Sequence, residues 1–198
     1  KIYNNYKNMI IKNKNILICY LSCKKNDNLW ENLLNKHTNS IIFYGNPNLE
    51  KNFTYKNRIL TLKCEDTYDY LPVKIFLMIK YILKIQEFEN ITHIFKVDDY
   101  DTNVDKNINN KLNTIKLHDF CGQIIYKNFN LYSRKWHYNK CPKDSLWYNK
   151  KYEGEWTPWI NGGAGYILSR KALNIISNKN ITPLEIYHKY IYEDIMIA

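Results

Sequence analysis

Three carboxylates lie within four residues of this chain, directly after an apolar stretch. Asp98, Asp99 and Asp101 follow residues 94–97, which read as a buried strand. Carboxylates this close repel one another and are costly unless a cation lies among them. The natural partner is a hard divalent ion with oxygen ligands, Mg²⁺ or Mn²⁺, which usually also binds phosphate oxygens. Two interpretations stay open on this stretch alone: a metal site, or a solvated acidic turn.

Three other features could carry chemistry. Glu193 and Asp194 form a second carboxylate pair, for which an ordinary surface position is the simpler interpretation. Residues 162–165 contain three glycines, which permit positive φ and a close approach of the backbone to another group. The phosphate-loop patterns G-x-G-x-x-G and G-K-[ST] are both absent from this stretch. Lys74, off the solvent-facing stripe of a predicted helix, either extends its amino group to solvent or binds a phosphate.

The elements that must position these residues are short buried strands and amphipathic helices. Apolar runs predict strands at residues 16–21, 41–44, 59–62, 94–97, 120–126 and 166–168. Helices are predicted at 27–34, at 71–85, after a cap at Ser169, and after the capping box that begins at Thr182. In the helix after Ser169, we expect Ala172, Leu173, Ile175 and Ile176 to face inward. Residues 48–57 and 102–116 read as loops, the second with one helical turn, and 134–152 as a long ordered loop rich in aromatic residues.

The order of these elements indicates an α/β fold. In an open α/β sheet, ligands bind just beyond the carboxyl ends of the strands. The aspartates after residues 94–97 fall at such an end. We therefore expect the acidic cluster to lie at the ligand-binding edge of the sheet.

Composition argues against a nucleic-acid role despite the basic charge. Lys and Arg number 29 against 19 Asp and Glu, which gives a net charge of +10. The lysines are scattered, and arginine, the preferred reader of phosphates and bases, is nearly absent. Ile, Lys, Asn and Tyr supply about half of the chain, a bias typical of an AT-rich genome, such as that of a microbe or a large DNA virus.

Other bounds on the chain are weak. Its 198 residues suffice for one sizeable core. No apolar run reaches the ~18 residues of a membrane span, and no signal peptide is visible. Five cysteines without a C-x-x-C pair indicate neither a zinc site nor a full disulfide framework. The chain begins with Lys1, so we expect an excerpt or a processed form. Localisation stays open between the cytoplasm of a host or microbe and a Golgi-type lumen after removal of an anchor.

Taken together, these stretches resemble the β-1,3-glycosyltransferase family that includes the β-1,3-galactosyltransferases and Fringe. Residues 66–74 match the pattern D-x-Y-x-N-L-T-x-K except for Tyr70 and Pro72, and residues 96–101 resemble the metal motif K-x-D-D-D. The segment 161–169 is close to G-G-x-G-Y-x-L-S, and residues 193–195 fall where the family has E-D-V. The stretches 16–21 with Trp30, 41–45 and 134–136 also resemble family segments, in the right order.

The resemblance implies a fold and a reaction. Members have a GT-A fold, a Rossmann-type nucleotide-sugar-binding domain with a central, mixed and mostly parallel sheet flanked by helices. We therefore expect residues 1–15 as a lead-in and 16–198 as a single GT-A-like domain. The implied activity is transfer of a sugar of the galactose, glucose or N-acetylglucosamine class from a UDP-sugar, with inversion and dependent on Mn²⁺ or Mg²⁺. The acceptor would be a hydroxyl of a glycan or glycoprotein, and the linkage β-1,3.

The resemblance also implies roles for individual residues. Asp194 would be the catalytic base, with Glu193 as the alternative. The metal ligands would be Asp99, Asp101 and Asp98, and the nucleotide-sugar would be bound by Asp66, Tyr68, Lys74, Asp98 and Asp99. Trp156 and Trp159 would stack on a sugar and Gly162 and Gly163 would let it lie close, although such aromatics more commonly fill a small core.

Two departures from the family pattern leave alternatives open. Tyr100 replaces the third aspartate of the metal motif, so the ligands are either consecutive or form the D-x-D pair Asp99 and Asp101. The family often supplies a metal-binding histidine beyond the last residue of this chain. The alternatives to an active enzyme are a catalytically degenerate protein that binds nucleotide-sugar or glycan, and a basic nucleic-acid-binding module.

Overall fold

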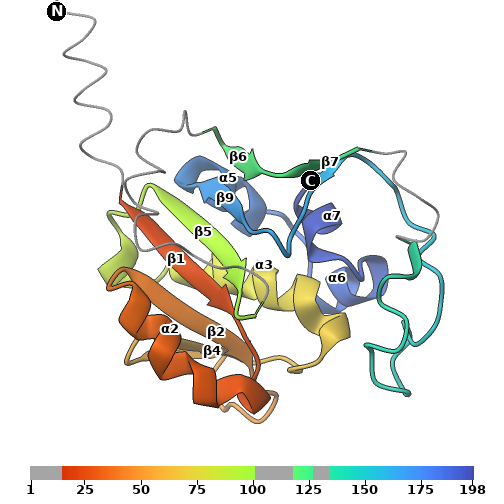
Figure 1. The fold of residues 1–198 in the computed structure, drawn as a ribbon, viewed down its shortest axis with the longest axis horizontal. Coiled ribbons are helices and arrows are strands. Elements are labelled where there is room, and N and C mark those ends of the chain that lie inside the picture. Colours follow the sequence, from red (N-terminus) through yellow and green to blue (C-terminus); the bar gives the residue numbers. More distant parts are fainter. Residues whose placement is uncertain (1–14, 101–117, 127–133) are drawn as a thin grey trace, which may run out of the picture.

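The computed structural model describes residues 15–100, 118–126 and 134–198, and they form an α/β fold (Figure 1). The main sheet has seven strands in the order β3-β4-β2-β1-β5-β9-β6. They are β1 (Ile16–Leu21), β2 (Ser40–Gly45), β3 (Phe53–Lys56), β4 (Ile59–Leu62), β5 (His93–Asp98), β6 (Phe120–Gly122) and β9 (Tyr166–Ser169). A second, two-stranded sheet pairs β7 (Ile124–Ile125) with β8 (Trp159–Ile160).

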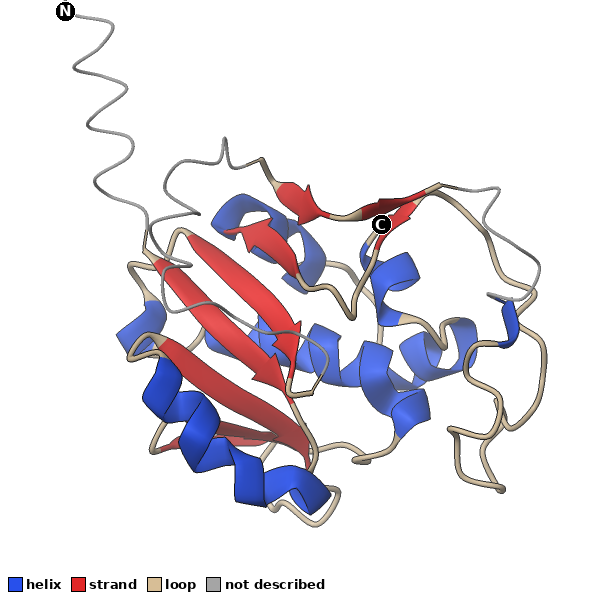
Figure 2. Ribbon diagram, in the orientation of Figure 1, coloured by secondary structure: helices blue, strands red, loops and turns tan. Residues whose placement is uncertain are grey.

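Helices lie on both faces of the main sheet (Figure 2). The α-helices are α2 (Trp30–Lys36), α3 (Leu71–Ile82), α5 (Arg170–Ser177), α6 (Pro183–Lys189) and α7 (Glu193–Ile197). The part of the chain that the structure describes also contains three 3₁₀ helices: η1 (Lys24–Leu29), η2 (Tyr68–Tyr70) and η3 (Gln86–Phe88). Within the described residues, no helix is both long and apolar enough to cross a membrane.

The pairing of the strands confirms the expected mixed, mostly parallel sheet. Strand β1 pairs in parallel with β2 and with β5, and β2 pairs in parallel with β4. Antiparallel pairs occur only towards the edges of this described sheet, at β3–β4, β5–β9 and β6–β9. The four central strands therefore end at the same edge.

Both faces of the central strands are buried, which explains their nearly continuous apolar sequences. Along β1, Leu17 and Cys19 contribute to the core under α3, whereas Ile18 and Tyr20 pack on the opposite face with Trp30 of α2. Successive side chains of a strand point to opposite faces, so nearly every position of these strands is apolar. Most of their polar residues lie where the strands end, and Lys96 inside β5 is an exception.

Three of the predicted elements differ from the structure. Residues 48–57 are not only a loop, because β3 forms a hairpin with β4 through Asn57 and Arg58, whose φ angles are 52° and 63°. Two consecutive positive φ angles make the tight turn that antiparallel strands require. Residues 120–126 form two short strands in different sheets instead of one strand. The helix predicted at 71–85 ends at Ile82.

The prediction that Ile175 faces inward is wrong, because 54% of its surface is exposed. At 3.6 residues per turn, Ile175 lies on the opposite side of α5 from Leu173, which is fully buried.

The two N-terminal caps are as predicted: Ser169 accepts a hydrogen bond from the backbone of Ala172, and Thr182 forms a capping box with Glu185.

The third glycine of residues 162–165 is required by the junction of β9 and β5. Gly165 has a φ of 83°, and a Cβ atom there would lie 2.9 Å from the carbonyl oxygen of Lys96 and 3.0 Å from Val97. Both the backbone conformation and the space exclude a side chain. The close approach expected from the glycines is thus, at Gly165, an approach to strand β5 of the same chain.

We predict that Gly165→Ala lowers the free energy of unfolding by about 2 kcal/mol or more, from the strained φ and the contact with β5. Gly163→Ala is the matched control, because a Cβ there would meet only Asn161 Oδ1, at 3.6 Å. Urea denaturation of both variants measures the difference. Equal losses of stability in the two variants would contradict the explanation.

Candidate active site

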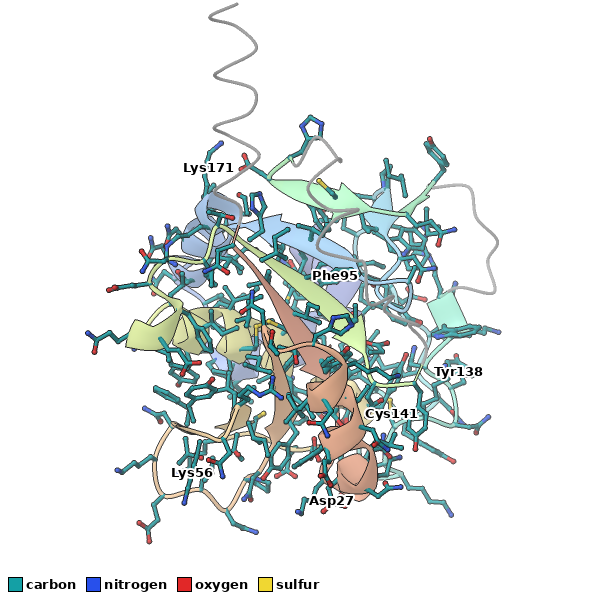
Figure 3. All side chains as sticks on the ribbon, turned by 60° about the vertical axis from the view of Figure 1, so that its left-hand side comes forward. Asp27, Lys56, Phe95, Tyr138, Cys141 and Lys171 are labelled. Atoms are coloured by element: carbon teal, nitrogen blue, oxygen red, sulfur yellow. The ribbon has the colours of Figure 1, made fainter. Side chains whose placement is uncertain are left out.

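A cleft of about 820 Å³ opens at the carboxyl ends of β1 and β5. We call it the strand-end cleft. Its lining includes Ser22, Asp66, Tyr68, Lys74, Asp98, Asp99 and Lys140. Asp98 and Asp99, predicted at the ligand-binding edge of the sheet, therefore lie beside a cavity. Cys141, from the long loop that begins at residue 134, also borders the cleft near the end of β5 (Figure 3).

Asp99 is held in a fixed orientation at this cleft. Its Oδ2 accepts hydrogen bonds from Ser22 Oγ at 2.6 Å and from Asn26 Nδ2 at 2.9 Å. Ser22 Oγ in turn accepts from the indole of Trp30 at 2.8 Å. Sequence reasoning missed these supporting residues, because they follow β1 and meet Asp99 only through the pairing of β1 with β5.

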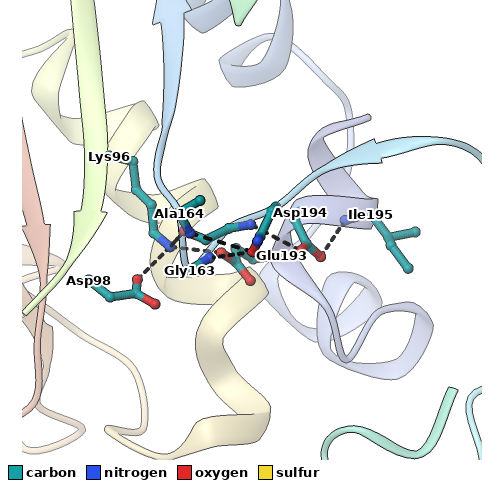
Figure 4. Close-up of polar contacts among 9 residues, drawn as sticks. Lys96, Asp98, Gly163, Ala164, Glu193, Asp194 and Ile195 are labelled. Atoms are coloured by element: carbon teal, nitrogen blue, oxygen red, sulfur yellow. Dashed lines mark hydrogen bonds and ion pairs between the residues drawn. The ribbon is translucent and has the colours of Figure 1, made fainter. Parts of the chain in front are cut away.

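Asp98 already has a cation beside it, and that cation is Lys96. Two residues apart on one strand, they lie on the same side, and Lys96 Nζ donates to Asp98 Oδ1 at 2.6 Å. Lys96 is fully buried and also donates to Glu193 Oε1 at 2.8 Å and to the Gly162 carbonyl at 3.2 Å (Figure 4). The alternation of side chains along the strand could have predicted the pairing of Lys96 with Asp98 from the sequence.

Lys74 and Asp66 form a second buried ion pair on the wall of the cleft. Lys74 is 2% exposed, so its amino group does not extend to bulk solvent. It donates to Asp66 Oδ1 at 3.0 Å, and Asp66 also accepts from the backbone of Gly45 and of Lys24. One carboxylate thus joins the ends of β2 and α3 to the loop after β1, and it shapes the cleft.

The carboxylate pair at the start of α7 is not an ordinary surface pair. Glu193 is 8% exposed, and Asp194 is partly buried beside it. Asp194 Oδ2 accepts from the backbone of Gly162 at 3.2 Å, and Oδ1 accepts from that of Ile195 at 2.9 Å. Burial, followed by the charge of Glu193, raises the pKa of Asp194 to about 7, while the Gly162 amide opposes the increase. A carboxylate with such a pKa can accept a proton near neutral pH.

Asp194 lines a second cavity of about 190 Å³, which we call the tryptophan pocket. Its lining includes Trp136, Trp156, Trp159, Asn161, Tyr192 and Asp194. Trp136 is 58% exposed, whereas Trp159 is 8% exposed and packs edge-on against Trp156 with ring centroids 4.6 Å apart. Of the two tryptophans predicted to stack on a sugar, Trp159 therefore belongs largely to a small core, and Trp136 offers the more open ring.

The two cavities are neighbours. Lys140, in the lining of the strand-end cleft, lies with Nζ 3.9 Å from the ring centroid of Trp136 and 5.3 Å from that of Tyr68. Tyr68 borders the same cleft and packs against the aromatic cluster that contains Trp159 and Tyr192. The negative charges of Glu193 and Asp194 add to burial in raising the pKa of Tyr68. A ligand in the cleft and one in the pocket would thus meet near Tyr68 and Asp194.

The first two glycines of residues 162–165 differ in what they approach. A Cβ atom at Gly162 would collide with Glu193 Oε1, so this glycine makes room for a side chain of the chain itself. Gly163 has space around its Cα, and its amide donates to Asn161 Oδ1 at 3.1 Å. Gly162 and Gly163 were both predicted to let a sugar lie close to the backbone, and Gly163 has the space for this.

A divalent metal fits the donor chemistry of the strand-end cleft only if phosphate oxygens and water complete the ligand shell that the described side chains begin. Asp101 lies outside the described residues. Within 15–100, 118–126 and 134–198, no three His, Cys, Asp or Glu side chains come close enough to hold a metal ion. Asp99 is the better candidate ligand, because the charge of Asp98 is balanced by Lys96. Mg²⁺ commonly takes one or two carboxylates and completes its shell with phosphate oxygens and water, which matches this donor set.

Comparison with known proteins identifies a family. The family model described as Galactosyltransferase matches residues 48–197. The match includes the Asp66–Lys74 pair, the end of β5, the glycines and α7. No curated protein sequence matches the chain.

The titration of Asp194 gives a first test of this geometry. Its pKa is higher in the folded protein, about 7, than its ordinary value of 3.8. Between these values the folded state holds a proton that the unfolded state has lost, so the free energy of unfolding should fall as the pH rises from about 4 to about 7. The pH dependence of urea denaturation, compared between wild type and Asp194→Asn, isolates this contribution.

Carbon NMR of the carboxyl groups provides the control. Glu193→Gln removes the neighbouring charge and should lower the titration midpoint of Asp194. A midpoint near 4 in the wild type, with the same pH dependence of stability in wild type and Asp194→Asn, would contradict the described environment.

Proposed function

Because this chain belongs to the galactosyltransferase family, within the β-1,3-glycosyltransferases, we propose that it transfers a sugar from a UDP-sugar to a hydroxyl of a glycan or glycoprotein, with inversion. The observation that carries the proposal is Asp194, a carboxylate of raised pKa in the lining of the tryptophan pocket, which adjoins the strand-end cleft where Lys140 contacts Trp136. One cavity has the charges that a nucleotide diphosphate needs. The other has the aromatic lining that a sugar needs.

The strand-end cleft is the donor site in this proposal. Lys25, Lys74 and Lys140 line it. Lys25 and Lys140 supply positive charge for the diphosphate, whereas the charge of Lys74 is paired with that of Asp66. Asp66 and Tyr68 border the place proposed for the nucleotide and fix the position of Lys74 and of the cleft wall. Asp99, together with Asp98 and Asp101, would hold Mn²⁺ or Mg²⁺. When bound, the metal would act as a Lewis acid that stabilises the negative charge of the departing diphosphate.

The tryptophan pocket is the acceptor site. The open ring of Trp136 and the partly buried ring of Trp156 would pack against the apolar face of a sugar. Asn161, in the same lining, can hydrogen-bond to a sugar hydroxyl. Gly163 leaves room for the ring to approach the backbone.

Asp194 is the general base. Its two backbone hydrogen bonds hold the carboxylate at the pocket, where it can take the proton from the acceptor hydroxyl as that oxygen attacks the donor sugar. Attack and departure on opposite sides of the anomeric carbon invert its configuration in one step. The chain then needs no nucleophile of its own. Glu193 is less suited to this role, because it is paired with Lys96.

We predict that UDP binding depends on the metal and on Asp99. Calorimetric titration of UDP should give a dissociation constant at least about tenfold lower with Mn²⁺ than without it. This difference should disappear in Asp99→Ala and in Asp99→Ala/Asp101→Ala, which lose the oxygen ligands. Asp144→Ala removes an exposed aspartate outside the lining of the cleft and should bind as the wild type does.

Other outcomes of this titration would favour the alternatives. UDP binding that ignores both the metal and the substitutions would contradict the proposed donor site. Binding of DNA or RNA that is tighter than that of UDP and sensitive to salt would instead support a basic nucleic-acid module. Metal-dependent UDP binding without hydrolysis or transfer of any UDP-sugar would support a degenerate member of the family.

We predict that Asp194→Asn lowers kcat by about 10² to 10⁴-fold, because the amide cannot accept the acceptor's proton. UDP affinity should stay within about twofold of wild type, since Asp194 lies outside the lining of the strand-end cleft. A screen of UDP-sugars with glycan acceptors measures kcat, and Asp144→Asn serves as the control. A kcat for Asp194→Asn close to that of the wild type would remove Asp194 from the mechanism.

A further inference from the structure

Lys96 is a fully buried charged group between Asp98, which lines the strand-end cleft, and Glu193, the neighbour of Asp194. The proposed transfer uses it neither as base nor as ligand. The residue has no exposed surface. Its amino group contacts two carboxylates, Asp98 at 2.6 Å and Glu193 at 2.8 Å. It also donates to the Gly162 carbonyl at 3.2 Å. Three segments distant in the sequence therefore meet at one nitrogen atom.

Stability alone is a weak reason for such an arrangement. Removing a lysine and two carboxylates from water is costly, and apolar residues of similar volume often pack at least as well. Uncharged residues at positions 96 and 193 could fill this space without that cost. What an apolar contact would lack is direction, because hydrogen bonds from one amino group to three acceptors fix how the segments lie relative to one another.

Two short chains of contacts connect Lys96 to Asp194. The first passes through Glu193, which is the sequence neighbour of Asp194 and begins helix α7. The second passes through Gly162, whose carbonyl accepts from Lys96 while its amide donates to Asp194 Oδ2. A Cβ atom at Gly162 would collide with Glu193, so the two chains of contacts are packed against each other. At the other end, Lys96 contacts Asp98 (Figure 4), and Asp98 directly precedes Asp99 in the chain.

We propose that Lys96 is a positioning residue that ties helix α7, and with it Asp194, to the carboxyl end of β5. This inference rests on the proposed function, because it assigns the donor to the end of β5 and the proton transfer to Asp194. The tie fixes the distance between the bound donor and the base. A misplacement of about 1 Å between reacting groups can reduce a rate by about 100-fold, so the tie acts on kcat.

The test separates positioning from simple charge balance. Lys96→Met alone leaves Glu193 buried without its cation, and we expect it to fold poorly. The double variant Lys96→Met/Glu193→Gln removes both charges, and we expect it to fold. If Lys96 serves only to balance charge, this variant should have the kcat of Glu193→Gln alone, because Asp194 loses the same neighbouring charge in both. If Lys96 is the tie, the kcat of the double variant should fall about 100-fold below that of Glu193→Gln, while the dissociation constant for UDP stays within about threefold.

Hydrogen exchange gives a second readout that needs no substrate. The Gly162 amide, which is bonded to Asp194, should exchange about tenfold faster in the double variant, because the loop and α7 separate more often. Backbone amides of β1 should keep their wild-type rates. Leu173→Ala, which removes a fully buried side chain of α5, controls for a general loss of stability and should leave the exchange of Gly162 relative to β1 unchanged.

The outcomes are distinguishable. The kcat of Glu193→Gln and wild-type exchange at Gly162 in a folded double variant would overturn the role of Lys96. An unstable double variant with uniformly faster exchange would also overturn it, because Lys96 would then support the whole fold. If the wild-type protein transfers no sugar, the proposed function fails, and the exchange of Gly162 alone still decides whether Lys96 holds α7 to β5.

Discussion

Burial of both faces of the parallel strands is the constraint on which the site depends. Because α2 packs on one face and α3 on the other, β1, β2 and β5 are apolar at nearly every position, and polar chemistry is confined to their ends. Lys96 is the exception inside a strand, and it is tolerated because its amino group points along the strand to Asp98 and across to Glu193. The parallel pairing of β1 with β5 then brings Ser22 and Asn26 to Asp99.

The balance of buried charges divides the carboxylates by role. Asp66 and Asp98 each have a lysine, so their charges are balanced and their positions fixed. Asp99 is oriented at the cleft by two neutral donors, the Ser22 hydroxyl and the Asn26 amide. Asp194 has backbone donors but no paired cation of its own among the described residues, and burial with the charge of Glu193 raises its pKa. Lysine partners, neutral side-chain donors and backbone donors thus give the carboxylates of this site three different environments.

Much of this organisation could be predicted from the sequence, for reasons that are local. Apolar runs identified the strands at residues 16–21 and 59–62, and the residue types at Ser169 and Thr182 identified two helix caps, because these signals depend only on neighbouring residues. The hairpin of β3 was missed, since its strand alternates exposed and partly buried residues and depends on the turn at Asn57 and Arg58. The resemblance of the motifs to the galactosyltransferase family was confirmed by the match over residues 48–197.

What the sequence by itself determined is the set of reactive groups and their order: an acidic cluster at a strand end, a glycine stretch and a second carboxylate pair. Only the tertiary structure decided their environments. The same pair that reads as an ordinary surface feature is buried, because Gly162 and Lys96 close over Glu193 and Asp194 from segments 32 and 97 residues away. Likewise, Trp159 of β8 is buried in an aromatic cluster and Trp136 of the long loop is exposed, although both line the tryptophan pocket. Burial and hydrogen-bond partners come from distant segments, and no local pattern encodes them.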